Sequence, residues 1–202
     1  MSIAVKVQTG AEYIAEERLF RLTVEQYRRM SEVGILNEDD RVELLEGLLI
    51  AKMTKSPPHD VAIDLTRDAI AELLPAGWRI RIQSAINTPD SEPEPDIAVV
   101  LGPARRYVKA HPRPKDVALL VEVADASLAE DRGRKARLYA RARIPVYWLV
   151  NLQESTVEVY TDPKGGRSPA YGRRRDYGID ESVPLTIGEE EVGEIAVEEI
   201  LP

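Results

Sequence analysis

The chain has 202 residues, of which 44% are hydrophobic and 31% are charged, and it contains no cysteine. This length and composition predict one compact domain with flanking elements, and they exclude a disulfide framework, a thiolate zinc site and a cysteine nucleophile. No apolar run approaches the length of a membrane span, and the first residues lack a signal-peptide segment, so we expect a cytoplasmic protein with no membrane partner.

The formal net charge of −8 is unevenly distributed along the chain. Residues 180–202 carry eight acidic and no basic side chains, so the remainder of the chain is neutral. Within that remainder, residues 132–143 and residues 173–175 form two basic clusters. Because local patches and not net charge meet phosphates, the composition leaves a nucleic-acid partner open.

The first elements are marked by local signals. Residues 1–20 have mixed polarity and are expected to form an N-terminal arm. Thr23 and Gln26 are spaced as a capping box, which predicts a helix that ends near Gly34. Residues 41–50 then indicate a strand or a hairpin around Gly47. After a pair of prolines a helix is expected over residues 59–74, with four apolar residues at helical spacing: Val61, Leu65, Ala69 and Leu73.

The remaining elements are mostly strands. Strands are expected over residues 78–83, 96–101, 117–123, 146–150 and 156–160, and a helix over residues 129–143. After a Gly165-Gly166 turn we expect one or two edge strands and a short acidic helix. Strands interleaved with helices predict an α/β sandwich. We expect a core domain over residues 21–163, and C-terminal strands with an acidic tail, residues 164–202, packed on it.

Two of the apolar strands carry one carboxylate each. Asp96 begins its strand directly after Pro95, and Glu122 lies in a strand with no water-seeking face. Desolvating a carboxylate is costly unless a partner or a metal compensates it. Either acid alone is more often part of a structural salt bridge, but the pair together predicts a metal-assisted hydrolytic site.

A lysine on the following helix extends this constellation. Helical spacing places Lys135 on one face with Asp131, Leu138 and Ala142, which is the face that packs on the sheet. Such a lysine can orient or activate a water, or stabilise charge on a phosphate in the transition state. The alternative is a buried ion pair with Asp131 or Glu122. The same helix carries a second stripe of three basic residues, Arg134, Arg137 and Arg141. This stripe is either a solvated face or a phosphate contact.

These residues resemble the PD-(D/E)XK nuclease superfamily and, more closely, the Uma-type family of proposed restriction endonucleases. The resemblance covers roughly residues 22–163 and consists of residues 41–47, 95–100, 120–123 and 145–150, together with Lys135 and Tyr139. It implies a restriction endonuclease-like fold, an α+β arrangement with a mixed β-sheet flanked by helices.

The resemblance also implies site residues, a cofactor and a partner. Asp96, Glu122 and Glu43 would bind Mg²⁺ or Mn²⁺, Lys135 would be catalytic with them, and DNA would be the substrate. Glu46 is the second candidate for the role of Glu43. Because strand alternation places these two glutamates on opposite faces, at most one of them faces the site.

The chain departs from the usual pattern at two places. The superfamily lysine two residues after the strand glutamate is Ala124 here, and the resemblance matches Lys135 on the next helix instead. The Ser-Pro-Ser-Thr that usually follows the glutamate strand reads Asp-Ala-Ser-Leu over residues 125–128, where Asp125 could add an outer carboxylate. His59 and Gln83 are lesser candidates, since a histidine at a helix start is more often a cap or a surface residue.

Three functions therefore compete. The first is a metal-dependent endonuclease that hydrolyses DNA phosphodiester bonds. The second, favoured by Ala124 and by the neutral body, is a catalytically inactive nucleic-acid-binding or regulatory module of the same fold. The third is a structural or interaction protein that uses its acidic tail and edge strands, with a homodimer as a further expectation.

Overall fold

A central sheet organises the chain. The structure is a computed structural model that describes residues 19–202, so nearly all of the expected arm over residues 1–20 lies outside the described residues. The sheet has six strands in the order β3-β4-β5-β6-β7-β8, with β5 and β6 parallel and the other neighbours antiparallel. They are β3 (Trp78–Ile82), β4 (Ile97–Leu101), β5 (Val117–Ala124), β6 (Val146–Asn151), β7 (Thr156–Lys164) and β8 (Ala170–Tyr177). The sequence predicts β3 to β7, and β8 is an edge strand that follows residues 165–166, as expected.

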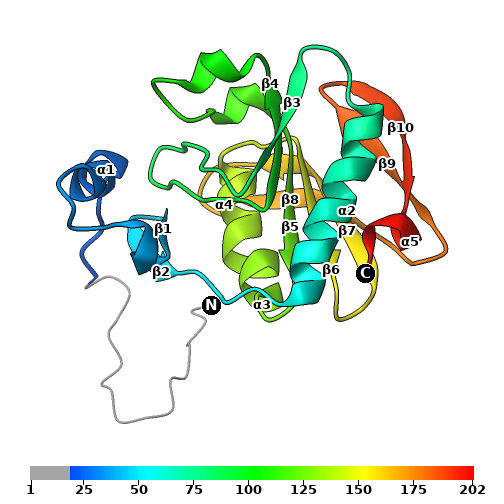
Figure 1. Ribbon diagram of the computed structural model, residues 1–202, viewed down its shortest axis with the longest axis horizontal. Coiled ribbons are helices and arrows are strands. Elements are labelled where there is room, and N and C mark those ends of the chain that lie inside the picture. Colours follow the sequence, from blue (N-terminus) through cyan, green and yellow to red (C-terminus); the bar gives the residue numbers. More distant parts are fainter. Residues whose placement is uncertain (1–18) are drawn as a thin grey trace, which may run out of the picture.

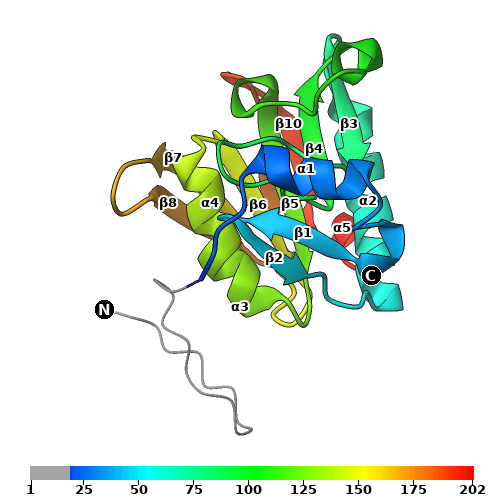
Figure 2. The same ribbon diagram turned by 90° about the vertical axis from the view of Figure 1, so that its left-hand side faces the viewer.

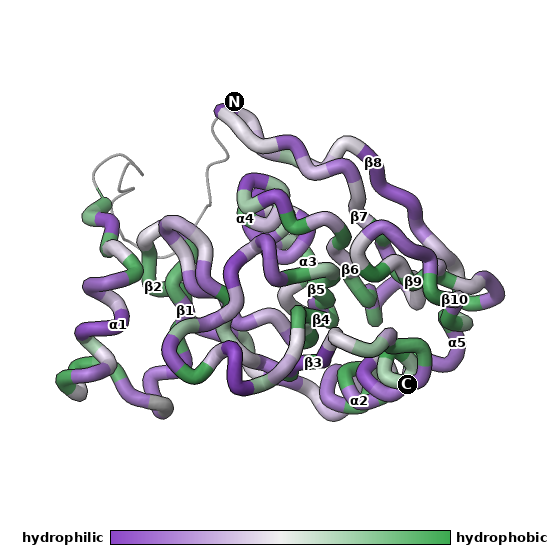
Figure 3. The backbone as a smooth tube through the Cα atoms, turned by 90° about the horizontal axis from the view of Figure 1, so that it is seen from above, coloured by the Kyte–Doolittle hydropathy of each residue, from purple (hydrophilic) through white to green (hydrophobic). Residues whose placement is uncertain are grey.

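Helices cover both faces of this sheet. Figure 1 shows α2 (Pro57–Leu73) on one side and α4 (Ala136–Arg141) on the other. All residues of β5 and β6 are buried, as expected for strands covered on both faces, and Figure 3 shows how hydrophobic the middle of the sheet is compared with β8. This arrangement is the mixed sheet flanked by helices that the sequence predicts.

Each face of the sheet has its own apolar core. The core on the α2 side includes Val121, Trp148 and the inner face of α2, and the core on the α4 side includes Leu120, Leu149 and Leu138. Glu122 alternates with Val121 and Val123, so its side chain belongs to the α4 side of the sheet. The site is therefore built on the α4 side.

The inner face of α2 differs from the expected one. The helix begins two residues before residue 59, and its buried residues are His59, Ala62, Ile63, Thr66 and Ile70. Val61, which the apolar spacing marked, is 46% exposed. The helix itself is confirmed, and Ala69 and Leu73 pack against the core, but the buried stripe also includes a threonine and a histidine, which a search for apolar spacing passes over.

The N-terminal elements lie over the α4 side of the sheet, as Figure 2 shows. They are α1 (Val24–Glu32), the 3₁₀ turn η2 (Glu38–Asp40) and the hairpin of β1 (Val42–Leu45) and β2 (Leu48–Ala51). The capping box forms as predicted, with Thr23 and Gln26 each donating a backbone amide to the other's side chain. The hairpin is held in place at Gly47, whose amide donates to the carbonyl of Asp90 at 2.9 Å and whose carbonyl accepts from Leu22 at 2.8 Å.

The helix expected over residues 129–143 is interrupted. It consists of α3 (Leu128–Glu130), a π-helical turn (Asp131–Lys135) and α4. π-helical turns are rare and are frequent at functional sites. A periodicity of 3.6 residues does not reveal such a turn, because the apolar positions on either side of it still fall near the same face.

The C-terminal segment packs on the α2 side. Two 3₁₀ turns, η3 (Ala104–Tyr107) and η4 (Pro114–Asp116), lie between β4 and β5. Beyond β8, which is an edge strand of the main sheet, β9 (Ser182–Ile187) and β10 (Glu190–Ala196) form a sheet of their own, followed by α5 (Val197–Ile200). The expected domain boundary after residue 163 falls at the end of β7, and β8 continues the central sheet. None of the helices within residues 19–202 has the length and apolarity needed to cross a membrane.

Candidate active site

The candidate residues meet where the hairpin, β4, β5 and the π-helical turn come together. Glu43 comes from β1, Asp96 directly precedes β4, Glu122 lies in β5, and Lys135 ends the π-helical turn. They line one cavity of about 330 Å³, together with Asp131. The structure thus brings together all four residues that the sequence singled out for catalysis.

Lys135 is the centre of this group. Its Nζ lies 3.1 Å from Oε1 of Glu122, 3.5 Å from Oδ1 of Asp131 and 3.6 Å from Oε1 of Glu43. Burial lowers the pKa of Lys135, but the carboxylates of Glu122, Glu43 and Asp131 outweigh it, so the pKa lies well above its usual value. The lysine is therefore a permanent cation shared among three acids.

Among these acids, Glu122 has the environment that least favours its charged form. Its side chain is 3% exposed, and burial raises its pKa well above the usual value. Lys135 opposes this shift, while the negative charges of Asp131, Asp96 and Glu43 add to it. The hydroxyl of Tyr139 donates to Oε1 of Glu122 at 2.5 Å. The carboxylate is thus held in place by two neighbours but is poorly compensated in charge.

Asp96 has a different environment. Its Oδ2 accepts from the amide of Val123 at 3.0 Å and lies 3.3 Å from Nε2 of His59, and its Oδ1 accepts from Gln83 at 3.4 Å. Burial raises the pKa of Asp96, but the contact with His59 and the amide of Val123 outweigh it, and the pKa is lowered. Asp96 is an ionised carboxylate with a fixed orientation.

His59 is more important than the sequence indicated. It lies in the first turn of α2 and is 9% exposed, with its imidazole directed at Asp96. Burial lowers its pKa, but the hydrogen bond to Asp96 outweighs that effect and raises it. The expectation of a cap or a surface residue was wrong, because the rotation of α2 about its axis turns this position inward.

The hairpin decides between Glu43 and Glu46. Glu43 is 5% exposed, and its Oε2 accepts from the amide of Glu94 at 2.9 Å. Glu46 occupies the turn with φ +52° and lies 3.3 Å from Arg141, outside the cavity. Only one of the two glutamates lines the cavity, as predicted, but for another reason than strand alternation, because Glu46 lies in the turn after β1.

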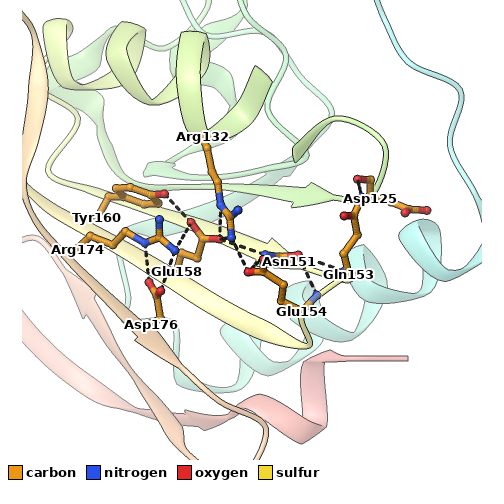
Figure 4. Close-up of polar contacts among 9 residues, drawn as sticks. All are labelled: Asp125, Arg132, Asn151, Gln153, Glu154, Glu158, Tyr160, Arg174 and Asp176. Atoms are coloured by element: carbon orange, nitrogen blue, oxygen red, sulfur yellow. Dashed lines mark hydrogen bonds and ion pairs between the residues drawn. The ribbon is translucent and has the colours of Figure 1, made fainter. Parts of the chain in front are cut away.

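A second buried acid fixes the π-helical turn (Figure 4). Glu158 on β7 is fully buried, and its Oε1 accepts from Nε of Arg132 at 2.8 Å. It also accepts from the hydroxyl of Tyr160 at 2.5 Å and lies 3.2 Å from Arg174. Glu122 and Glu158 both pair in register with Leu149 on β6. The π-helical turn therefore directs Lys135 to Glu122 and Arg132 to Glu158.

The predicted arginine stripe lies outside the cavity. Arg134 is 4.0 Å from Glu130, and Arg141 is 2.7 Å from Asp90, so these two charges are partly compensated. Arg137 is exposed and makes no ion pair with any residue that the structure describes. Besides Lys135 and His59, the cavity is lined by three basic residues that were not predicted; they are Arg41, Lys52 and Lys55.

The chemistry of the acids fits a divalent cation. Among the buried residues of the cluster, four acids face two cations, Lys135 and His59; the acids are Glu43, Asp96, Glu122 and Asp131. Neither carboxylate oxygen of the buried Asp131 accepts a hydrogen bond. Such hard, uncompensated oxygen ligands suit Mg²⁺ and Mn²⁺. Over residues 19–202, however, no three acidic or histidine side chains converge as ligands, since the acids close on the ammonium of Lys135 instead.

Comparisons with known proteins place this site in context. A family model, Uma2, described as "putative restriction endonuclease", matches residues 24–187. A crystal structure described as a "putative nuclease belonging to DUF820" from Anabaena variabilis is similar in fold, with a TM-score of 0.66 and 16% sequence identity. The similarity covers 89% of this chain and 97% of that one. No curated protein matches the chain.

Proposed function

The chain belongs to the Uma2 family of putative restriction endonucleases, and on that premise we propose that it is a metal-dependent endonuclease that hydrolyses DNA phosphodiester bonds. The observation that carries this proposal is the buried cluster of Glu43, Asp96, Glu122 and Lys135 in one cavity. Buried acids whose charge is only partly compensated destabilise a folded protein, so this cluster indicates a functional site.

The acids would hold the cofactor. Asp96, Glu122 and Glu43 would bind Mg²⁺ or Mn²⁺, which when bound lowers the pKa of a water and offsets the charge of the scissile phosphate. His59 and the amide of Val123 keep Asp96 ionised and oriented. The hydroxyl of Tyr139 orients Glu122.

Lys135 would supply a fixed positive charge to the reaction. Its ammonium donates three hydrogen bonds and cannot accept one, so it can orient an attacking water and stabilise charge that develops on the phosphate. In the structure the same ammonium is shared by three carboxylates. The carboxylates that pair with Lys135 are those that would hold the divalent cation, and the role of Lys135 would be to face the substrate.

Cleavage of plasmid DNA tests the proposal. Purified protein with Mg²⁺ or Mn²⁺ should convert supercoiled plasmid to nicked or linear forms, and EDTA should prevent this. Asp96→Asn, Glu122→Gln, Lys135→Met and Glu43→Gln should each lower the rate at least 100-fold, whereas Glu46→Gln, in the same hairpin but outside the cavity, should not. Cleavage that survives Asp96→Asn, Glu122→Gln and Lys135→Met would overturn the assignment.

One observation favours the inactive module as a second candidate. The superfamily position of the lysine is Ala124, which is fully buried at the end of β5 and provides no charge. Salt-dependent DNA binding with no cleavage under any divalent cation would support that candidate. If the protein has no affinity for nucleic acid at low salt, the third function remains, that of a structural or interaction protein. The expected homodimer stays a prediction, which the molar mass from light scattering would test.

A further inference from the structure

The mouth of the cavity carries basic residues above its acidic interior. We call Arg41, Lys52 and Lys55 the rim cations: Arg41 directly precedes β1, and Lys52 and Lys55 lie in the segment that joins β2 to α2. Their side chains line the same cavity as Glu43, Asp96 and Glu122. Arg41 and Lys55 are exposed whereas these three acids are buried, so the two cations lie nearer to solvent than the acids do.

Two of the rim cations have no acidic partner. Arg41 donates to the carbonyl of Met53 at 3.2 Å, and neither it nor Lys55 forms an ion pair with any residue from 19 to 202. Both are exposed, while Lys52 is paired with Glu94. The rim therefore keeps two positive charges available to solvent and to a ligand.

The segment that carries these charges is fixed at both ends. The amide of Lys52 donates to the carbonyl of Arg41 at 2.8 Å, and the hydroxyl of Ser56 donates to Asp125 at 3.1 Å. Arg41 itself has φ +45°, a left-handed conformation that is uncommon for a residue with a side chain. The positions of Arg41 and Lys55 beside the cavity are thus set by the fold.

We propose that Arg41 and Lys55 bind the phosphodiester backbone of DNA at the mouth of the cavity, in place of the arginine stripe on the helix. This inference rests on the proposed function, because it names the residues that hold its substrate. The acids inside the cavity repel a polyanion, so uncompensated cations at the rim are needed to bring a phosphate within reach. Arg134 and Arg141 are less suited, since each already faces an acid, and Arg137, although exposed and without an ion pair among the described residues, does not line the cavity either.

Binding can be measured separately from cleavage. A fluorescein-labelled 20-base-pair duplex is titrated in EDTA, with anisotropy recorded between about 50 and 200 mM salt. For the double variant Arg41→Ala/Lys55→Ala we expect an affinity at least tenfold lower than that of the wild type. The slope of log K against log salt should fall by about 1.8, which is about 0.9 for each lost phosphate contact.

The control has the same change in charge. Arg105→Ala/Lys109→Ala removes two exposed cations that lie outside the cavity, and it should change affinity and slope much less. Lys55→Ala alone, at an exposed side chain that makes no hydrogen bond or ion pair with the described residues, should lower the slope by about 0.9 and keeps the test valid if Arg41→Ala perturbs the hairpin. Equal losses in the rim and control variants would overturn the inference.

The outcomes separate the two proposals. If the wild type cleaves DNA and the rim variant binds as tightly as the wild type, the rim inference fails and the proposed function stands. If the wild type binds but does not cleave, and the rim variant loses binding, the proposed function fails and the rim inference stands. A wild type that does not bind the duplex at about 50 mM salt, the low end of the titrated range, would overturn the rim inference.

Discussion

Nζ of Lys135 lies 3.1 Å from Oε1 of Glu122, and the hydroxyl of Tyr139 donates to that same oxygen at 2.5 Å. Both side chains come from the helical segment that follows β5, four positions apart. One buried carboxylate oxygen is thus held by a cation and by a neutral donor at once. Because Asp131, Asp96 and Glu43 surround Glu122 with like charge, removal of either neighbour should have consequences for stability and for titration.

Loss of the lysine should destabilise the fold in a pH-dependent way. Lys135→Met leaves buried acids without their cation, which should lower the free energy of unfolding by about 3–5 kcal/mol at pH 8. The pKa of Glu122 is already raised, so its protonated form favours the folded state at low pH and this contribution disappears as pH rises. The loss should therefore be smaller at pH 5. Urea unfolding at both pH values measures it, and Lys115→Met, at an exposed lysine, is the control.

Divalent cations should stabilise the wild type, more at pH 8 than at pH 5.5. Binding requires Glu122 as a carboxylate, and because its pKa is raised, Glu122 becomes protonated at a higher pH than usual as pH falls. At a concentration about 100-fold above Kd, Mn²⁺ should add about 2.7 kcal/mol, or about 5–10 °C in Tm. Differential scanning fluorimetry with Mn²⁺ and with EDTA measures this shift. A larger shift at the lower pH, or an equal shift in Asp96→Asn, would contradict the metal assignment.

Tyr139→Phe should shift the pH dependence of the stabilisation by Mn²⁺ to higher pH. A hydrogen bond to the ionised form of a carboxyl lowers its pKa, so without the hydroxyl the pKa of Glu122 rises further. The Mn²⁺-induced rise in Tm should then require a higher pH than in the wild type. The matched control is Tyr171→Phe, which loses a hydroxyl that donates to the carbonyl of Ile144 and not to a carboxylate. A Tyr139→Phe profile that coincides with the control would refute the role of this hydroxyl.

Neighbouring arginines on the helix should differ in their effect on stability. Arg132→Ala removes a donor from the fully buried Glu158, which should cost about 1–3 kcal/mol because Arg174 and Tyr160 remain. Arg134→Ala removes only a 4.0 Å contact with Glu130 and should change stability by no more than about 0.5 kcal/mol. Urea unfolding measures both, and a larger loss in Arg134→Ala would contradict the anchoring of the π-helical turn by Glu158.

The central strands, the acid directly before β4 and the acid within β5 could be predicted from the sequence alone. The apolar runs of β4 and β5 are continuous because both faces are buried, so Asp96 and Glu122 stand out against them without any knowledge of distant contacts. The inward face of Lys135 also follows from local periodicity, since three side chains along one helical face share a direction. These features depend on neighbours close in the chain.

The rest of the site depends on contacts between segments that are distant in the sequence. Whether Glu43 or Glu46 faces the cavity depends on how the hairpin turn packs against Asp90 and Leu22, and the inward position of His59 depends on the rotation of α2. The π-helical turn is fixed by Glu158, 26 residues away from Arg132 in sequence. Each of these outcomes is set by hydrogen bonds and packing between distant segments, which local periodicity cannot encode.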